Sequence, residues 1–304
     1  MVKKAKQHFN ENPISWALAA LFIGGVCIGT SPIFVRLSEV GPSASAFWRI
    51  LLVLPLFYMT MERKVKVDQD IPLFKNKKIM WGLFMCGFLF AADLAFWHWA
   101  LQFTTVANAT LLSNLMPIVV AVGAYFIFKE KLTKTFYFGL FLALTGAVLL
   151  AGGSRGEGQL LGNSLGVITA FFYGAYLLYV RWLRHMISTS FILFWTGVVS
   201  VLFLLPLAYF SNEVILPITN QGWLTLFGLA FISQFLGQGL ITYSLAHLPS
   251  AFGAVSLLIQ PIVATAIAWP LFGEALSTTD LLAASIILMG IVMARLGSVK
   301  RNTT

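Results

Sequence analysis

Long apolar segments recur along almost the whole chain, and this feature constrains the fold more than any other. Each segment has roughly 18–24 residues, the length at which a helix crosses the hydrocarbon core of a membrane. Lipid offers the backbone no hydrogen-bond partner, so a crossing segment must be a helix or a strand of a closed barrel. Barrel strands need only about 10 residues. We therefore predict an all-α integral membrane protein.

The apolar segments number ten. The weakest division separates the third segment from the fourth, where only residues 102–105 interrupt the hydrophobicity. The ten predicted transmembrane helices are 16–35, 44–61, 79–101, 104–128, 134–152, 162–181, 188–210, 222–244, 249–271 and 277–295.

Composition agrees with a surface that faces a lipid bilayer. Only 10% of the 304 residues are charged and 59% are hydrophobic, whereas soluble globular domains are about 25% charged. Cys27 and Cys86 both lie within apolar segments, which argues against a disulfide framework or a cysteine metal site. The four histidines show no metal-ligand spacing. We expect no bound metal and no cofactor.

The basic residues lie in short clusters between apolar segments, although the net charge of +9 could suggest a nucleic-acid partner. If the N-terminus is cytoplasmic, 17 of the 20 Lys and Arg residues fall on the cytoplasmic side, as the positive-inside rule requires. We therefore expect a multi-pass protein of the inner (plasma) membrane with both termini cytoplasmic, and no nucleic-acid partner. The sequence does not fix the oligomeric state, and a homo-oligomer is one of the alternatives.

The two halves of the chain are related by a shift of 144 residues. The shift aligns Pro-Ile-Val at 117–119 with the same triplet at 261–263, and Phe-x-Glu-x-Leu at 128–132 with its copy at 272–276. One shift holds across two helices and the turn between them, so chance is a poor explanation. The sequence therefore contains an internal repeat.

Each repeat contains five predicted helices, residues 16–152 in the first and 162–295 in the second. Five is an odd number, so the second repeat must enter the membrane from the opposite side. We predict a 5+5 bundle of two inverted repeats, an architecture typical of secondary transporters, whose sites form where the repeats meet.

With these motifs the sequence resembles the drug/metabolite transporter superfamily, specifically the EamA-type permeases. The repeated Pro-Ile-Val and Phe-x-Glu-x-Leu blocks carry the resemblance, together with an alanine-rich stretch and the spacing from Pro42 to Arg49. It implies a 5+5 bundle with a central cavity and no bound cofactor. Members carry amino acids, related metabolites, choline and other small solutes, so the resemblance says little about the substrate.

Two charged side chains fall well inside predicted helices, away from their ends, where a charge is costly and by default marks a functional site. Arg49 lies roughly 8 Å below the outer end of the second helix, and Asp93 roughly 21 Å above the inner end of the third. At this matching depth we expect Arg49 and Asp93 to pair directly or through the substrate. Asp93 is also the candidate for proton coupling. The alternative is a static ion pair that fixes helix packing.

Trp97 follows Asp93 by one helical turn, on the face that also carries Phe90 and Phe96. A carboxylate flanked by aromatic rings suits an amine, through charge and cation–π attraction. The alternative is that these rings only face lipid.

Uncharged polar residues near the middle of their helices complete the expected substrate site. Amide side chains there can bind a solute carboxylate or amine, or they can instead bridge helices, for about 0.6 kcal/mol each. Glu130 and its repeat partner Glu274 are expected at hairpins, where each carboxylate serves the N-terminus of the next helix. The uncharged site candidates are Asn114, Tyr173, Gln234 and Gln260.

The sequence thus predicts a secondary transporter, an exporter or exchanger, that moves a small organic solute by alternating access. An amino acid or amine-type metabolite is the first expectation, and a lipid-linked or other amphipathic substrate is the alternative. A membrane-embedded enzyme is the alternative from another class, but it would need a nucleophile–base pair or a metal set inside the bundle. We find neither in the sequence and expect no catalytic residues.

Overall fold

The computed structural model describes residues 13–61, 76–104, 106–151, 159–272 and 278–298. Within these ranges every regular element is a helix, and eight helices are long and apolar enough to cross a membrane. Two shorter apolar helices, Met116–Phe128 and Lys134–Leu149, fall in the predicted fourth and fifth spans. The prediction of an all-helical, multi-pass membrane protein is confirmed. Glu274 lies outside the described residues.

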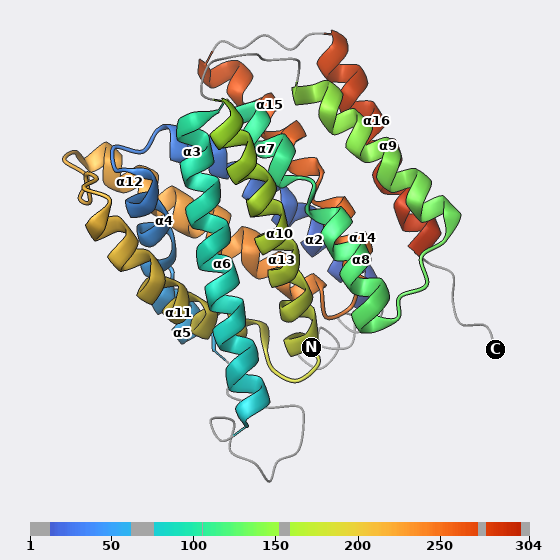
Figure 1. Ribbon diagram of the computed structural model, residues 1–304, viewed down its shortest axis with the longest axis horizontal. Coiled ribbons are helices and arrows are strands. Elements are labelled where there is room, and N and C mark those ends of the chain that lie inside the picture. Colours follow the sequence, from blue (N-terminus) through green and yellow to red (C-terminus); the bar gives the residue numbers. More distant parts are fainter. Residues whose placement is uncertain (1–12, 62–75, 105, 152–158, 273–277, 299–304) are drawn as a thin grey trace, which may run out of the picture.

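The helices pack into one bundle (Figure 1). In the first half they are α2 (Pro13–Gly29), α3 (Ser31–Arg36), α4 (Pro42–Leu51), α5 (Leu54–Met59), α6 (Lys77–Phe103), α7 (Val106–Ser113), α8 (Met116–Phe128) and α9 (Lys134–Ala151). In the second half they are α10 (Gln159–Arg184), α11 (Thr189–Phe210), α12 (Asn220–Gly228), the π-helix η2 (Leu229–Gln238), α13 (Gly239–Ser244), α14 (Ser250–Ser256), α15 (Ile259–Phe272) and α16 (Thr278–Ser298).

Several predicted spans are interrupted near their middle, and prolines explain where. Proline lacks the N–H donor and clashes with the carbonyl of the preceding turn. The fourth span divides into α7 and α8 just before Pro117, and the ninth into α14 and α15 just before Pro261. Broken helices are tolerated inside a membrane where the freed backbone lines a cavity or packs against protein. The break between α7 and α8 falls at Asn114.

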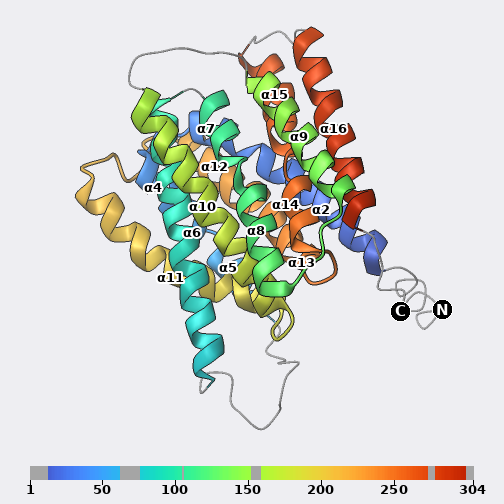
Figure 2. The same cartoon turned by 45° about the vertical axis from the view of Figure 1, so that its right-hand side comes forward.

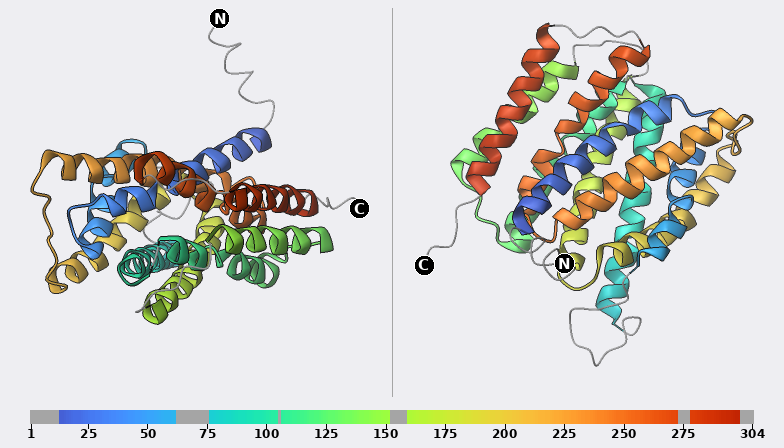
Figure 3. Two further views of the ribbon diagram at one scale, coloured as in Figure 1. Left: turned by 90° about the horizontal axis from the view of Figure 1, so that it is seen from above. Right: turned by 180° about the vertical axis from the view of Figure 1, so that it is seen from behind.

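The eighth span has a different irregularity, the π-helix η2. It packs against α2, where a Cβ added to Gly24 would lie 2.9 Å from the carbonyl oxygen of Gly237. Figure 3 shows these two segments side by side from behind. π-helical turns are rare and are frequently found at functional sites. This one carries two buried glutamines, Gln234 and Gln238.

Close contacts between the two halves come in reciprocal pairs. A Cβ added to Gly29 on α2 would lie 2.8 Å from the Cβ of Val263 on α15. A Cβ added to Gly174 on α10 would lie the same 2.8 Å from the Cβ of Val119 on α8. The two glycines are 145 residues apart in the sequence, and the two valines are 144 apart. Each contact is therefore the counterpart of the other.

The last helices of the halves, α9 and α16, lie side by side along their lengths (Figures 1 and 2). A Cβ added to Gly146 would lie 2.9 Å from the carbonyl oxygen of Ala283, and one added to Gly290 would lie 2.7 Å from that of Gly139. The shift of 144 converts each of these contacts into the other. Only glycine allows the two backbones to approach so closely.

Glu130, just after α8, ties the first half to the second. Its Oε1 accepts hydrogen bonds from the backbone N (3.1 Å) and Oγ (3.0 Å) of Ser250, and it pairs with Nη2 of Arg181 at 3.1 Å. The carboxylate therefore serves the N-terminus of α14, in the other half. The sequence predicts instead that it serves α9, the next helix, and this prediction is wrong. The reason is tertiary packing, which brings α14 against α8.

Candidate functional site

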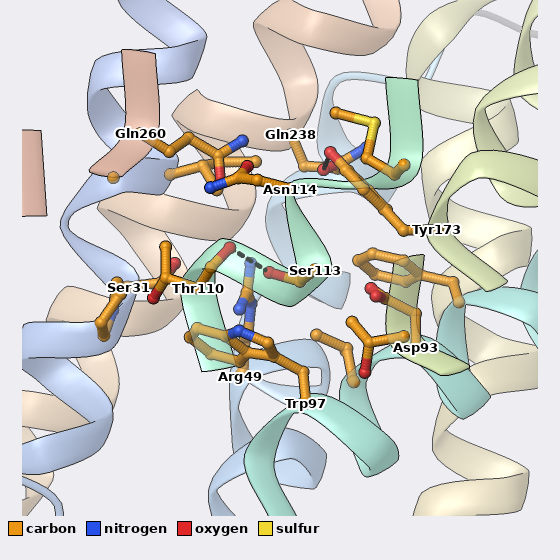
Figure 4. Close-up of a pocket in the computed structure, with 17 residues that line it drawn as sticks. Ser31, Arg49, Asp93, Trp97, Thr110, Ser113, Asn114, Tyr173, Gln238 and Gln260 are labelled. Carbon is orange, nitrogen blue, oxygen red and sulfur yellow. Dashed lines mark hydrogen bonds between the residues drawn. The ribbon is translucent and has the colours of Figure 1, made fainter. Parts of the chain in front are cut away.

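A pocket lies where helices of both halves converge (Figure 4). Together with its open mouth it encloses about 620 Å³ of space. Its apolar lining includes Phe90, Leu94, Trp97 and Met116. Its polar lining consists of Ser31, Arg49, Asp93, Thr110, Ser113, Asn114, Thr169, Tyr173, Gln238 and Gln260.

Six of the seven residues that the sequence singled out line this pocket. They come from helices α4, α6, α10 and α15 and from the α7–α8 break. The seventh, Gln234, is buried but is not part of the pocket lining. The six are Arg49, Asp93, Trp97, Asn114, Tyr173 and Gln260.

Gln234 lies behind Arg49 and orients it. The Oε1 atom of Gln234 accepts a hydrogen bond from Nε of Arg49 at 2.9 Å. Arg49 is only 4% exposed, so this bond fixes one edge of a buried guanidinium and leaves its other N–H donors for other partners. The contribution of Gln234 is therefore to position Arg49.

Asp93 enters the pocket from α6 and is 7% exposed. No hydrogen bond or ion pair joins its carboxylate to any other residue in the part of the chain that the structure describes. Figure 4 shows Asp93 and Arg49 apart on the pocket wall, so the two do not pair directly. A buried charge without a partner is costly, and the pocket is where a compensating proton or cation can reach it.

Two side-chain contacts join the helices that carry Arg49 and Asp93. Nδ1 of His98 on α6 lies 2.8 Å from Oγ of Ser45 on α4. One residue further along α6, Nε1 of Trp99 donates to Oγ of Ser43 at 2.8 Å. These two contacts hold α4 against α6 and so fix the separation of the two charges.

Aromatic rings form one wall of the pocket. Phe90 stacks on Tyr176 with ring centroids 4.7 Å apart, and Tyr176 stacks in turn on Tyr173 at 6.0 Å. The hydroxyl of Tyr173 donates to Oε1 of Gln238 at 3.3 Å. Phe96, expected on the same face, instead stacks on a phenylalanine of α10 and does not line the pocket. The predicted aromatic face is therefore only partly present.

Sequence reasoning missed several polar lining residues. Gln238 follows Gln234 by four residues, and both are polar residues in an apolar span. That spacing could have marked Gln238. The small hydroxyl residues gave no signal, because serine and threonine are common in transmembrane helices and usually bond to their own backbone. The missed hydroxyl residues are Ser31, Thr110, Ser113 and Thr169.

Comparison with known proteins identifies the chain as a transporter. The EamA-like transporter family matches it twice, over residues 15–152 and 160–296. An uncharacterized transporter of Helicobacter pylori is 25% identical over 89% of this chain and 90% of its own length. The pseudopaline exporter CntI of Pseudomonas aeruginosa is 21% identical over 75% of this chain and 77% of its own. A match to an uncharacterized transporter of Acidianus ambivalens spans about half of that relative, 53%.

The fold also has a counterpart among solved structures. A crystal structure with 17% sequence identity superposes with a TM-score of 0.74, over 93% of this chain and 97% of the other. This likeness concerns the fold alone. With the family matched in both halves, the chain belongs to the EamA-like transporter family, within the drug/metabolite transporter superfamily that its sequence motifs resemble.

Proposed function

We propose that this protein is a secondary transporter that moves a small zwitterionic or amine-bearing metabolite, an amino acid in the simplest case, through the pocket. The observation that carries the proposal is the buried carboxylate of Asp93, which lines the pocket without a partner in the described structure. Arg49 lines the same pocket, oriented by Gln234.

A zwitterion complements these two charges. Arg49 presents a planar set of donors that suits a carboxylate, while Asp93 supplies the counter-charge for an ammonium group. Trp97 lines the pocket one helical turn from Asp93, where its ring adds cation–π attraction. Because the two charged side chains make no direct contact, the solute can bridge them.

Alternating access follows from two inverted five-helix repeats, ten crossings in all, with both termini cytoplasmic in the inner membrane. The contact that Gly29 makes with Val263 is the counterpart of the one that Gly174 makes with Val119, and this correspondence supports a pseudo-two-fold relation between the halves. The pocket lies where the halves meet, as in transporters built from inverted repeats.

Export driven by proton exchange is the mode of transport that we propose. A relative is named as an exporter, which supports the direction. Asp93 then binds the substrate amine in one half of the cycle and a proton in the other, so that its buried charge is compensated in both.

Uptake into proteoliposomes tests this proposal, with labelled amino acids, amines and nucleosides and with or without a proton gradient. Wild type should carry at least one zwitterion or amine in a gradient-dependent way. Arg49→Gln and Asp93→Asn should each lower uptake at least about tenfold, since a hydrogen bond to a charged group is worth about 1.5–3 kcal/mol. A transported solute that is indifferent to both substitutions would refute the proposal.

A further inference from the structure

Hydroxyl side chains in the transmembrane helices of this protein often bond to their own backbone. Oγ1 of Thr145 donates to the carbonyl of Phe141 at 2.9 Å, and Oγ of Ser285 donates to that of Leu281 at 2.8 Å. Thr145 is half-buried and Ser285 is exposed, and neither lines the pocket. Such i to i−4 bonds satisfy a hydroxyl without any other partner.

Four polar groups that line the pocket depart from this pattern. The hydroxyl oxygens of Ser31, Thr110 and Thr169, and the amide nitrogen Nδ2 of Asn114, are buried and make no hydrogen bond within the described ranges. Leaving a buried polar group unpaired costs more than an ordinary hydrogen bond contributes. Because their residues line the cavity, a rotation of the side chain can present these groups to whatever fills it.

Three of these four residues, with Gln260, form a cluster away from Asp93. In Figure 4, Ser31, Thr110, Asn114 and Gln260 lie together on one side of the pocket and Asp93 lies on the other. Their helices are contiguous, because α15 packs against both α3 and α7. We call these four residues the polar subsite.

We propose that the polar subsite binds a hydroxyl or carboxamide group of the transported solute. It would thereby select metabolites with a hydrogen-bonding side chain over aliphatic ones of the same shape. This inference rests on the proposed function, in which Arg49 and Asp93 hold the charged end of the solute.

The chemistry of the polar subsite favours such a group. The free amide nitrogen of Asn114 needs an acceptor, and the serine and threonine hydroxyls can each donate or accept. A hydroxyl or a carboxamide offers both functions, whereas a methyl group offers neither and would leave Ser31, Thr110 and Asn114 unsatisfied. A second carboxylate fits less well, because the polar subsite contains no basic side chain.

Matched pairs of solutes test the inference. Wild type in proteoliposomes should take up L-threonine about 3- to 10-fold better than its isostere L-valine, because this factor corresponds to the net free energy of one neutral hydrogen bond. It should prefer L-asparagine over L-leucine by a similar factor. Thr110→Val and Asn114→Leu should bring the ratios toward one. The control Thr145→Val removes a hydroxyl of the same kind that bonds only to its own helix, and it should keep the wild-type ratios.

The outcomes separate the inference from the proposed function. If valine and leucine are carried as well as their polar isosteres while Asp93→Asn still abolishes uptake, the polar subsite holds only water and the inference is overturned, but the proposed function stands. If none of the four amino acids is carried, the inference is wrong, and the wider solute panel then decides the proposed function. The wild-type ratios decide the matter even if a variant fails to fold.

Discussion

Replacing Asp93 with asparagine should abolish transport without destabilising the protein. The substitution keeps the shape of the side chain and breaks no hydrogen bond or ion pair, because the carboxylate makes none within the described structure. What it changes is the charge. A static structural role and a substrate-binding role therefore predict opposite results for transport and for stability.

The expected change in stability follows from two opposing effects. Asp93 lies beyond 4 Å of Arg49, so the lost attraction is below about 4 kcal/mol at the effective dielectric constant of partly buried pairs. Removing a buried charge without a partner recovers several kcal/mol of desolvation free energy. The free energy of unfolding should therefore change by less than about 1 kcal/mol, or about 3 °C in melting temperature.

Glu130→Gln is the matched control, since it makes the same chemical change at a carboxylate that does have partners. Glu130 pairs with Arg181 and holds the N-terminus of α14. Its loss should lower the free energy of unfolding by about 2 kcal/mol, less than the 3–5 kcal/mol of a fully buried pair.

Melting temperature in detergent and uptake into proteoliposomes measure both quantities for both variants. If Asp93→Asn melts several degrees below wild type but transports normally, Asp93 is a packing residue and the reasoning fails.

Three further predictions concern other parts of the molecule. Gly290→Ala should cost about 1–3 kcal/mol, because its Cβ would lie 2.5 Å from a backbone nitrogen of α9; Gly239→Ala, with nothing within 4 Å, should change the melting temperature little. Gln234→Leu should raise the KM for transport about 3- to 10-fold, because Arg49 loses the bond that orients it, and an unchanged KM would contradict that role. Hydrogen bonds from the side chain and backbone of Thr219 lower the pKa of Glu39, so its contribution to stability is present above its ordinary pKa and is lost as the pH falls through the lowered one. Melting curves between about pH 6 and 3 should show a smaller acid-induced loss for Glu39→Gln than for wild type.

Helix length and hydrophobicity were enough to predict the class of fold and most of the transmembrane segments. The features that sequence missed depend on packing. The π-helix leaves no mark in the hydrophobic pattern, and neither does the packing by which Gln238 lines the pocket while Gln234 lies behind Arg49. Similarly, nothing local in the sequence says that Glu130 meets Ser250, 120 residues away.

The sequence predicted how deep in the membrane the candidate site residues lie, but not how far apart they lie across the bundle. Counting residues from the ends of two helices placed Arg49 and Asp93 at the same level, and both do line one pocket. Depth is a single coordinate, however, and the separation across the bundle depends on how α4 packs against α6. That packing rests on hydroxyl contacts such as Ser45 with His98, which no periodicity indicates.

Protection of a cysteine in the pocket by the transported solute tests the central claim most directly. Ser113 lines the pocket, and Ser113→Cys exchanges only oxygen for sulfur; Cys27→Ser and Cys86→Ala remove the native thiols. The solute should slow alkylation of this cysteine with half-maximal effect near its KM for transport, and the added substitution Asp93→Asn should abolish the protection. A solute that is carried across the membrane yet leaves the alkylation rate unchanged would show that transport does not pass through this pocket.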